Sequence, residues 1–462
     1  MKFKKALLPL ILLTSLSACN SATISIEGGR LTTPKINKVS DKYQNQMSQK
    51  TYDSYLAFAK KFTSFVMDVN NLEDEKSLGI SIPDAYICLA ITGVLSKEES
   101  MDDVLSYLEL SSLEELRTAI KEVISTLGTL FKDYEGKLSG GYNLNSVWYN
   151  PDKVRLLKEK DEELYKDLEE VFDASLYHEA LTSDKANQYL KDNGLKDLPT
   201  PTIQLDDDDP SAMSVMSVYY CIDYFIDHEF YKQQYQSGKH KMDYTYSNNT
   251  SKVDYIEKRT TNIVYENENF YGAYMGINRL DMAFFLPNDK NALPSSILND
   301  VLNENYHNKK GKAIYSDGRE EETEQHNIHI SAPYFSLNNS ASLENEDLNK
   351  ILPVISDKFN DHGAGARIVE PRYELGYEYL FLDYIKQFSV MKFNYDGFYS
   401  CSVTIGGYGG ATSAEPVTIE NFELTLDHPY VFEVRKMIRV NEDKYVHLPI
   451  VIGEIVTPNY QD

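Results

Sequence analysis

The feature that most constrains the fold is a long polar connection close to the C-terminus. Tyr395–Pro416 reads YDGFYSCSVTIGGYGGATSAEP and lies between two apolar segments, Ile385–Asn394 and Leu426–Lys436, which both have the composition of β-strands. About thirty residues rich in glycine, serine and threonine therefore join two predicted strands. A compact domain seldom keeps so long a structureless connection unless it is functional or disordered. The fold must therefore present an exposed segment between two late strands.

The N-terminus is typical of a bacterial lipoprotein signal. Three lysines within the first five residues precede an apolar stretch, Ala6–Leu13, that is too short to span a bilayer as a mature helix. Small residues ending at Cys19 follow, and they resemble a lipobox. Cys19 is therefore predicted to be the lipidated first residue of the mature chain; the alternative is an ordinary secretory signal with an incidental cysteine.

This signal sets the predicted domain plan. Residues 1–18 are the signal peptide, residues 19–47 a polar tether and residues 48–462 a single domain, because no repeat or linker divides them. We expect the protein on the extracellular face of a bacterial membrane, anchored only through the lipid on Cys19.

Composition excludes several classes of partner. The formal net charge is −25 at pH 7, and the acidic chain has no basic stripe, which argues against nucleic acid and anionic lipid as partners. The three cysteines after Cys19 are too few for a disulfide framework. Cys88 and Cys221 lie in apolar runs and are predicted to be buried, whereas Cys401 lies in the polar connection without an identifiable activating partner.

The order of the predicted elements indicates an α+β fold. Helices are expected mainly in the first half, at residues 46–70, 83–94, 112–127, 152–172 and 185–192. After a short strand at 145–149, strands dominate from residue 212, at 214–225, 255–264, 274–286, 328–335, 388–393, 424–434 and 448–456, with helices at 293–303 and 345–359. The N-terminal helices should pack on large, mainly antiparallel sheets.

No catalytic or metal-binding motif has the required spacing. The chain lacks a G-x-S-x-G elbow, an H-E-x-x-H pair and a phosphate loop, and no lysine follows the glycines of 406–410. His326 and His329 would lie on opposite faces of a strand, and the acidic run 206–209 has the pattern of a solvated turn rather than of a calcium loop. We predict no catalytic residue, no metal site and no cofactor, and hence no enzyme.

Short motifs in a fixed order resemble the serpin family from about Tyr52 to Asn459. They are the helix Pro83–Val94, Asn145–Asp152 (NSVWYNPD), Ala186–Leu190 (ANQYL), Met282–Asp289 (MAFFLPND), Ala332–Leu337 (APYFSL), Leu352–Phe359 (LPVISDKF), Leu426–Lys436 (LDHPYVFEVRK) and Val451–Asn459 (VIGEIVTPN). The last two matches are the most specific, and together the motifs span nearly the whole predicted domain.

The resemblance implies that residues 397–420 are a reactive-centre loop, a bait for a protease. In the mechanism that it implies, the protease attacks the loop and forms an acyl-enzyme. The cut loop then inserts as a new central strand and drags the protease to the far pole before deacylation. The expected partner is an extracellular serine or cysteine protease, and the expected state is a monomer.

Matching the family hinge residue by residue identifies Gly397 as the hinge glycine. Alternate residues of an inserted strand face the core, so Phe398, Ser400, Ser402 and Thr404 would point inward. Three of them are small, whereas inhibitory serpins carry a small residue where Phe398 stands. Forcing a ring into a tight slot costs ~1–3 kcal/mol and would slow insertion.

Other departures from the family pattern concern positions that govern how the sheet opens. Tyr395 replaces the hinge glutamate, Gln387 the shutter histidine and Asp84 a helix serine, and the breach tryptophan is absent, with Tyr224 or Ile226 in its place. The second interpretation is therefore a non-inhibitory, serpin-fold surface lipoprotein that acts as a binding protein. The third is an unrelated acidic lipoprotein, such as an adhesin, which would lack the long loop.

Two counting rules place the scissile bond differently. Counting forward from Gly397 gives Ala411–Thr412, and counting back from Pro429 gives about Thr418–Ile419, so the loop is some seven residues longer than is usual. We prefer the forward count, because the sheet fixes the inserted length.

The residues before the scissile bond restrict the target protease. Residues 393–420 contain no lysine or arginine, which disfavours a trypsin-like target. Ala411 favours an elastase- or subtilisin-like protease, and Tyr408 leaves a chymotrypsin-like protease open.

Overall fold

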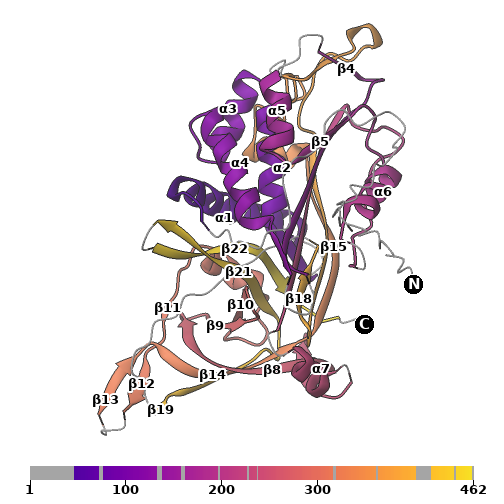
Figure 1. The fold of residues 1–462 in the computed structure, drawn as a ribbon. Coiled ribbons are helices and arrows are strands. Elements are labelled where there is room, and N and C mark those ends of the chain that lie inside the picture. The colour runs from indigo at the N-terminus through magenta and orange to yellow at the C-terminus, as the bar shows by residue number, and fades with distance from the viewer. Residues whose placement is uncertain are drawn as a thin grey trace, which may run out of the picture.

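The computed structural model describes most of the chain from Gln46 onward (Figure 1). The described residues are 46–71, 76–132, 138–157, 162–195, 198–225, 228–236, 238–315, 319–359, 363–401, 418–441 and 444–459. The predicted signal peptide and Cys19 lie outside them. Gln46 and Met47, which the sequence analysis assigned to the tether, belong to the fold, because Gln46 bridges to Arg439 and Met47 is buried.

The helices of the described part lie mostly in the first half of the chain. They are α1 (Gln49–Asn71), α2 (Ile82–Leu95), α3 (Glu98–Tyr107), α4 (Leu113–Leu127), α5 (Glu162–Glu170), α6 (Ser183–Asn193), α7 (His228–Tyr235), α8 (Ser295–Leu302) and α9 (Asn345–Ile351). The predicted capping box opens α4: the Ser112 side chain accepts from Glu115 N at 3.2 Å, and Glu115 Oε2 accepts from Ser111 N at 2.8 Å. No described helix is long and apolar enough to cross a membrane.

The candidate functional site described below lies in one of the two large sheets, which we call the central sheet. Its strand order is β15-β17-β18-β6-β3-β2, with β5 parallel to β3. These strands are β15 (Phe335–Glu344), β17 (Tyr384–Asn394), β18 (Gly397–Ser400), β6 (Met213–Tyr224), β3 (Leu138–Tyr149), β2 (Leu130–Lys132) and β5 (Ala174–Tyr177). Apart from the β3–β5 pair, its strand pairs are antiparallel.

A second, larger sheet runs in the order β1-β22-β21-β10-β9-β8-β14-β20, and β7 and β11 pair with β8. Its strands are β1 (Leu78–Ser81), β22 (Lys444–Ile455), β21 (Tyr430–Asn441), β10 (Asp281–Pro287), β9 (Phe270–Gly276), β8 (Asn249–Glu266), β14 (Gln325–Pro333), β20 (Asn421–Thr425), β7 (Lys241–Tyr246) and β11 (His307–Asn308). Two small sheets complete the described part: β13 (Glu320–Thr323), β12 (Gly311–Ile314) and β19 (Thr418–Ile419) form one, and β4 (Val154–Leu156) and β16 (Val369–Pro371) the other. The predicted α+β class is confirmed.

Aromatic side chains join the two large sheets. Phe335 and Phe393 of the central sheet meet Phe432 and Phe284 of the larger sheet, with ring centroids 4.9 Å apart for Phe335–Phe432 and 5.9 Å for Phe284–Phe393. All four rings are buried. This layer is continuous with the core beneath the N-terminal helices, so the helices and both sheets form one body (Figure 1).

Two predicted helices are shorter than expected. Residues 154–156 of the expected helix 152–172 pair with Val369–Pro371 instead, and the helix is confined to α5. The expected helix 345–359 ends at Ile351, because Pro353 follows and the residue before a proline avoids the helical conformation. Helix α7 and the β12–β13 hairpin were not predicted.

The aromatic layer gives a first prediction. Replacing Phe393 with alanine should lower the free energy of unfolding by about 3–5 kcal/mol, because it empties a ring-sized space that three neighbouring rings line. Denaturant unfolding measures this loss. Tyr445→Ala, at an exposed tyrosine, is the matched control and should change stability by less than about 0.5 kcal/mol. Equal losses in the two variants would contradict the packing described.

Candidate functional site

The candidate site begins where β17 turns into β18. Gly397–Ser400 pair antiparallel with β17 on one side and with β6 on the other, Ser400 lying opposite both Met391 and Cys221. β18 separates β17 from β6, and no pairing joins those two strands directly within the described residues. The first four residues of the predicted loop therefore occupy a central strand position (Figure 1).

Gly397 is required by its position. Its φ of +143° is rarely adopted by residues that carry a side chain, and a Cβ atom would lie 2.2 Å from Asp223 O. No other residue fits this turn without moving β18 away from β6.

Side chains alternate along β18. Phe398 is 1% exposed and Ser400 is fully buried. Phe398 belongs to the same core as Phe393, its register partner on β17. Tyr399 and Cys401 face the opposite side, where they pack in the cluster covered by α6. The sequence analysis expected the Phe398 ring to obstruct insertion. In the structure the ring fits into the core while β18 pairs in register with both β17 and β6. Ser402, Thr404, Ala411 and Thr412 lie outside the described residues.

Gln387 of β17 forms a joint with the start of α2. Its Oε1 accepts from Ser81 N at 2.9 Å, and its Nε2 donates to Ser81 O at 2.7 Å and to Asp84 Oδ2 at 3.2 Å. The Ser81 hydroxyl donates to Asp84 Oδ1. The two departures noted in the sequence, Gln387 and Asp84, are therefore direct partners. We call these three residues the Gln387 joint.

A buried carboxylate lies opposite the hinge. Asp223 of β6 is the register partner of Phe398 and is 1% exposed. Its Oδ2 accepts from the backbone N–H groups of Asn278, Arg279 and Leu280 at 3.1, 2.8 and 2.9 Å, in the turn between β9 and β10. Burial raises the pKa of Asp223 to about 7, against these hydrogen bonds, which lower it. The sequence analysis missed this residue, although an acid within the apolar run YYCIDY is a usable signal.

The loop returns to the body at β19 and β20. Ile419 lies opposite Ala313 of β12, and β20 runs parallel to β14. A protease needs a substrate segment that can enter its cleft, so a bond held in β19 is a poor candidate. This disfavours the backward count, which placed the scissile bond at about Thr418–Ile419.

The other candidate chemistry is not supported. His326 is buried and His329 points outward to Glu423, with Nδ1 and Oε2 2.8 Å apart, so the two histidines do lie on opposite faces. No group of three or more His, Cys, Asp or Glu side chains that could hold a metal occurs among the residues that the structure describes. Burial raises the pKa of the Cys401 thiol, which disfavours a thiolate nucleophile there.

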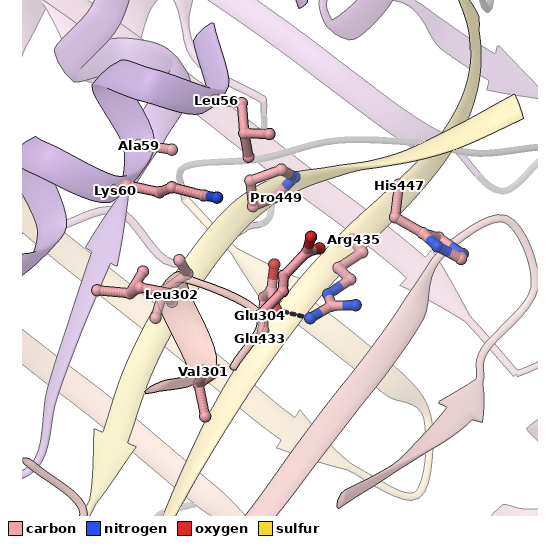
Figure 2. Close-up of a pocket in the computed structure, with 11 residues that line it drawn as sticks. Leu56, Ala59, Lys60, Val301, Leu302, Glu304, Glu433, Arg435, His447 and Pro449 are labelled. Carbon is pink, nitrogen blue, oxygen red and sulfur yellow. Dashed lines mark ion pairs between the residues drawn. The ribbon is translucent and has the colours of Figure 1, made fainter. Parts of the chain in front are cut away.

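A cavity between α1, α8, β21 and β22 is small and charged (Figure 2). The Glu433–Arg435 ion pair lies in its wall, and burial raises the pKa of Glu433 and lowers that of His447 to about 4. Its volume of about 20 Å³ has room for a water molecule. Cavities that take organic ligands are typically about 300–1,000 Å³, so this cavity is too small for them.

Solved structures similar to this one are serpins. The thermophilic serpin tengpin in its native state matches with a TM-score of 0.61 at 14% identity, over 94% of this chain and 100% of that one. An Arabidopsis serpin in its native stressed conformation matches with a TM-score of 0.58 at 16% identity, over 89% and 99%. For a serpin of the trematode Schistosoma haematobium the values are 0.57, 17%, 88% and 100%. The chain has the serpin fold. No protein-family model and no curated protein matches its sequence.

The chain therefore shares its fold with serpins at only 14–17% sequence identity. The segments that the sequence analysis compared with serpin motifs occupy one continuous body, with the long connection between β17 and β21. The resemblance drawn from the sequence is confirmed at the level of the fold.

Asp223 gives a prediction with a defined sign. Its raised pKa means that protonation favours the folded state, so the contribution of this group to stability is full below about pH 4 and declines as pH rises to about 7. Asp223→Asn keeps an acceptor for the three N–H groups and carries no charge. The variant should melt several degrees above the parent at pH 8, and this gap should close toward pH 4.

Asp427→Asn is the matched control with the opposite sign. A hydrogen bond from His428 and the nearby Lys290 ammonium lower the pKa of Asp427 to about 2. This variant should melt below the parent at pH 7, and the difference should shrink as pH falls from about 4 to 2. A pH-independent gap for Asp223→Asn would show that its carboxylate is not strained by burial.

Proposed function

We propose that this protein is a serpin-type inhibitor of an extracellular serine or cysteine protease, with residues 397–420 as the bait. The observation that carries the proposal is the location of β18 between β17 and β6, which do not pair with each other within the described residues. We call the strand position between these two strands the slot, and β18 occupies one end of it. The loop enters the central sheet at this point, as the proposed mechanism requires.

The two strands that would flank an inserted strand are long enough for it, because β6 has 12 residues and β17 has 11. In the observed register, Gly397 lies opposite Tyr224 and Ser400 opposite Cys221, so each step forward along the loop is one step back along β6. Continuing that register to Met213, the first residue of β6, assigns residues 401–408 to the remaining positions. An inserted strand would then pair along the whole of β6.

The chain's own residues set up this insertion. Gly397 provides the sharp turn, Phe398 fixes the start of the strand in the core, and Ser400 keeps the next inward position small. The Gln387 joint ties β17 to α2 at a position just before residues 391–394, the part of β17 that pairs with β18. The target protease would supply the nucleophile: it would form an ester or thioester with the Ala411 carbonyl and release the Thr412 amine, so this chain contributes no catalytic residue.

The proposed target and location rest on the sequence. The loop offers no cation to an acidic specificity pocket, and Ala411 suits an elastase- or subtilisin-like protease. A lipid on Cys19 would hold the inhibitor, as a monomer, at the outer face of a bacterial membrane.

A non-inhibitory binding protein of the serpin fold is the second candidate, and Gln387 in place of the family's histidine favours it. Thyroxine-binding globulin, in complex with thyroxine, matches this structure with a TM-score of 0.58 at 11% identity, over 89% of this chain and 100% of that one. The cavity of Figure 2 is too small to hold such a ligand. Such a protein would use its outer surface, for example the groove of about 560 Å³ lined by Arg259, Asn327 and His329.

Cleavage of the loop separates the two candidates. A broad protease should nick the soluble fragment 21–462 within the loop, and mass spectrometry should locate the cut. Insertion adds hydrogen bonds on both edges of the new strand, so we expect Tm to rise by more than about 10 °C and an SDS-stable complex to form with an elastase-like protease. An unchanged Tm with no complex would favour the binding protein.

Phe398 provides the matched variants. Phe398→Asp would bury a charge at the first inward position, so the cut loop should stay out, Tm should not rise on cleavage, and the protease should consume the protein as a substrate. Phe398→Leu keeps an apolar side chain and should behave as the parent does. Insertion in both variants would show that this position does not control entry.

A further inference from the structure

The two oxygens of the Asp223 carboxylate have different surroundings. Oδ2 accepts three backbone N–H groups from the turn between β9 and β10. Oδ1 is buried and has no hydrogen-bond partner among the residues that the structure describes. An ionised carboxylate would lose the water around Oδ1 and gain no partner there in return. The protonated acid is therefore the form that this site fits best.

β18 is the strand that pairs with β6 at Asp223. Phe398 lies opposite Asp223 in that pairing, and its ring belongs to the apolar core. On the other side of β6, the pairing with β3 extends only to Ile222, opposite Gly140. Within the described residues, the strand neighbour of Asp223 is therefore β18, which is four residues long.

The turn and the strand would respond differently to a charge on Asp223. A carboxylate accepts hydrogen bonds more strongly when it is ionised, so the turn 278–280 would stay attached. That turn is also closed by a hydrogen bond from Ile277 N to Leu280 O at 2.8 Å, and β10, which follows it, pairs with both β9 and β21. β18 offers only an apolar ring and four residues of pairing. Water reaches the carboxylate most easily if β18 separates from β6.

The charges around Asp223 do not compensate for its burial. The Arg279 guanidinium lies over the Phe131 ring, 4.4 Å from the ring centroid. Its charge lowers the pKa of Asp223, but burial has the larger effect and raises that pKa to about 7. Burial also raises the pKa of the Cys221 thiol on the same strand, so this group stays neutral near pH 7.

Lys436 and Asp281 are further buried ionisable groups near this turn. Burial lowers the pKa of Lys436, and the Arg279 charge lowers it further. Burial raises the pKa of Asp281, the residue after the turn, and the Arg435 charge opposes that shift. Both groups remain in a variant that lacks only the Asp223 carboxylate, so such a variant isolates the effect of Asp223.

We propose that Asp223 couples the pairing of β18 to pH: ionisation of its carboxylate releases β18 from β6 while the rest of the fold stays intact. β18 is then most firmly paired in acid and opens more often as the pH rises toward neutrality. The proposal concerns the observed pairing of β18, so it holds whether or not the protein inhibits a protease. In the proposed mechanism, acid would favour entry of the loop at this strand.

Hydrogen–deuterium exchange followed by mass spectrometry measures this opening. The peptide of interest covers residues 396–401, and β7, an edge strand that Asp223 does not contact, is the reference. Protection factors are corrected for the intrinsic effect of pH on exchange. A raised pKa in the paired state means that opening becomes more favourable between about pH 4 and pH 7 and is constant above that. We expect protection of 396–401 to fall at least tenfold from pH 5 to pH 7, and that of β7 to change less than threefold.

Denaturant tests whether the opening is local. Low concentrations of urea should leave the exchange of residues 396–401 nearly unchanged, because a local opening exposes little surface. Exchange that rises with urea as global unfolding does would show that β18 opens only together with the whole fold, and would overturn the proposal.

Two variants assign the effect to Asp223. Asp223→Asn keeps an acceptor for the turn and cannot ionise, so β18 should keep at every pH the protection that the parent has at pH 5. Asp223→Ser, a smaller uncharged acceptor, takes its place if that variant does not fold. Asp427→Asn is the matched control: it removes a carboxylate whose pKa is lowered to about 2, and its β18 should follow the parent.

A flat profile in the parent, or the same fall in protection in the uncharged variant, would overturn the proposal. Cleavage of the loop and the change in Tm test the proposed function by a separate measurement. Either proposal can therefore fail without the other.

Discussion

The structure depends on the separation of β17 from β6 by a strand of only four residues. Backbone N–H and C=O groups along two facing strand edges form strong hydrogen bonds when they are paired, which is why the proposed mechanism places an incoming strand between β17 and β6. Gly397 makes the turn into β18, the Gln387 joint ties β17 to α2, and Thr418 and Ile419 pair with β12 at the other end of the loop. In the proposed mechanism, these features decide when the slot is filled.

Buried tyrosines connect distant segments of the fold. The chain has 35 of them and one tryptophan, and several of the largest fully buried side chains are tyrosines. Their hydroxyls reach backbone carbonyls of distant segments: Tyr55 donates to Pro449 O at 3.0 Å, Tyr219 to Leu127 O at 2.8 Å and Tyr244 to Val456 O at 3.1 Å. A buried tyrosine thus fills space as phenylalanine does and also ties two segments together.

The sequence predicted the features that follow local patterns. The loop was visible from its glycine, serine and threonine content, and α4 from its capping box. The β12–β13 hairpin was missed because its strands are short and charged, and they are stabilised by β19, which is about a hundred residues away. Gln387 and Asp84 were noticed as departures from the family, but their contact joins residues 303 positions apart. The hydrogen bonds of Asp223 come from the turn between β9 and β10, more than fifty residues away, so the local sequence could not indicate them.

The Gln387 joint also restricts how this sequence can change. Gln387 satisfies one N–H and one C=O of Ser81 and a carboxylate of Asp84, and a buried polar group left unpaired costs about 1–3 kcal/mol. A histidine placed at 387 alone has a different shape and number of donors, so it would leave at least one of these partners without its hydrogen bond. A change at either position therefore requires a matching change at the other. Relatives that carry this fold should show glutamine with aspartate, or histidine with serine, and few mixed combinations.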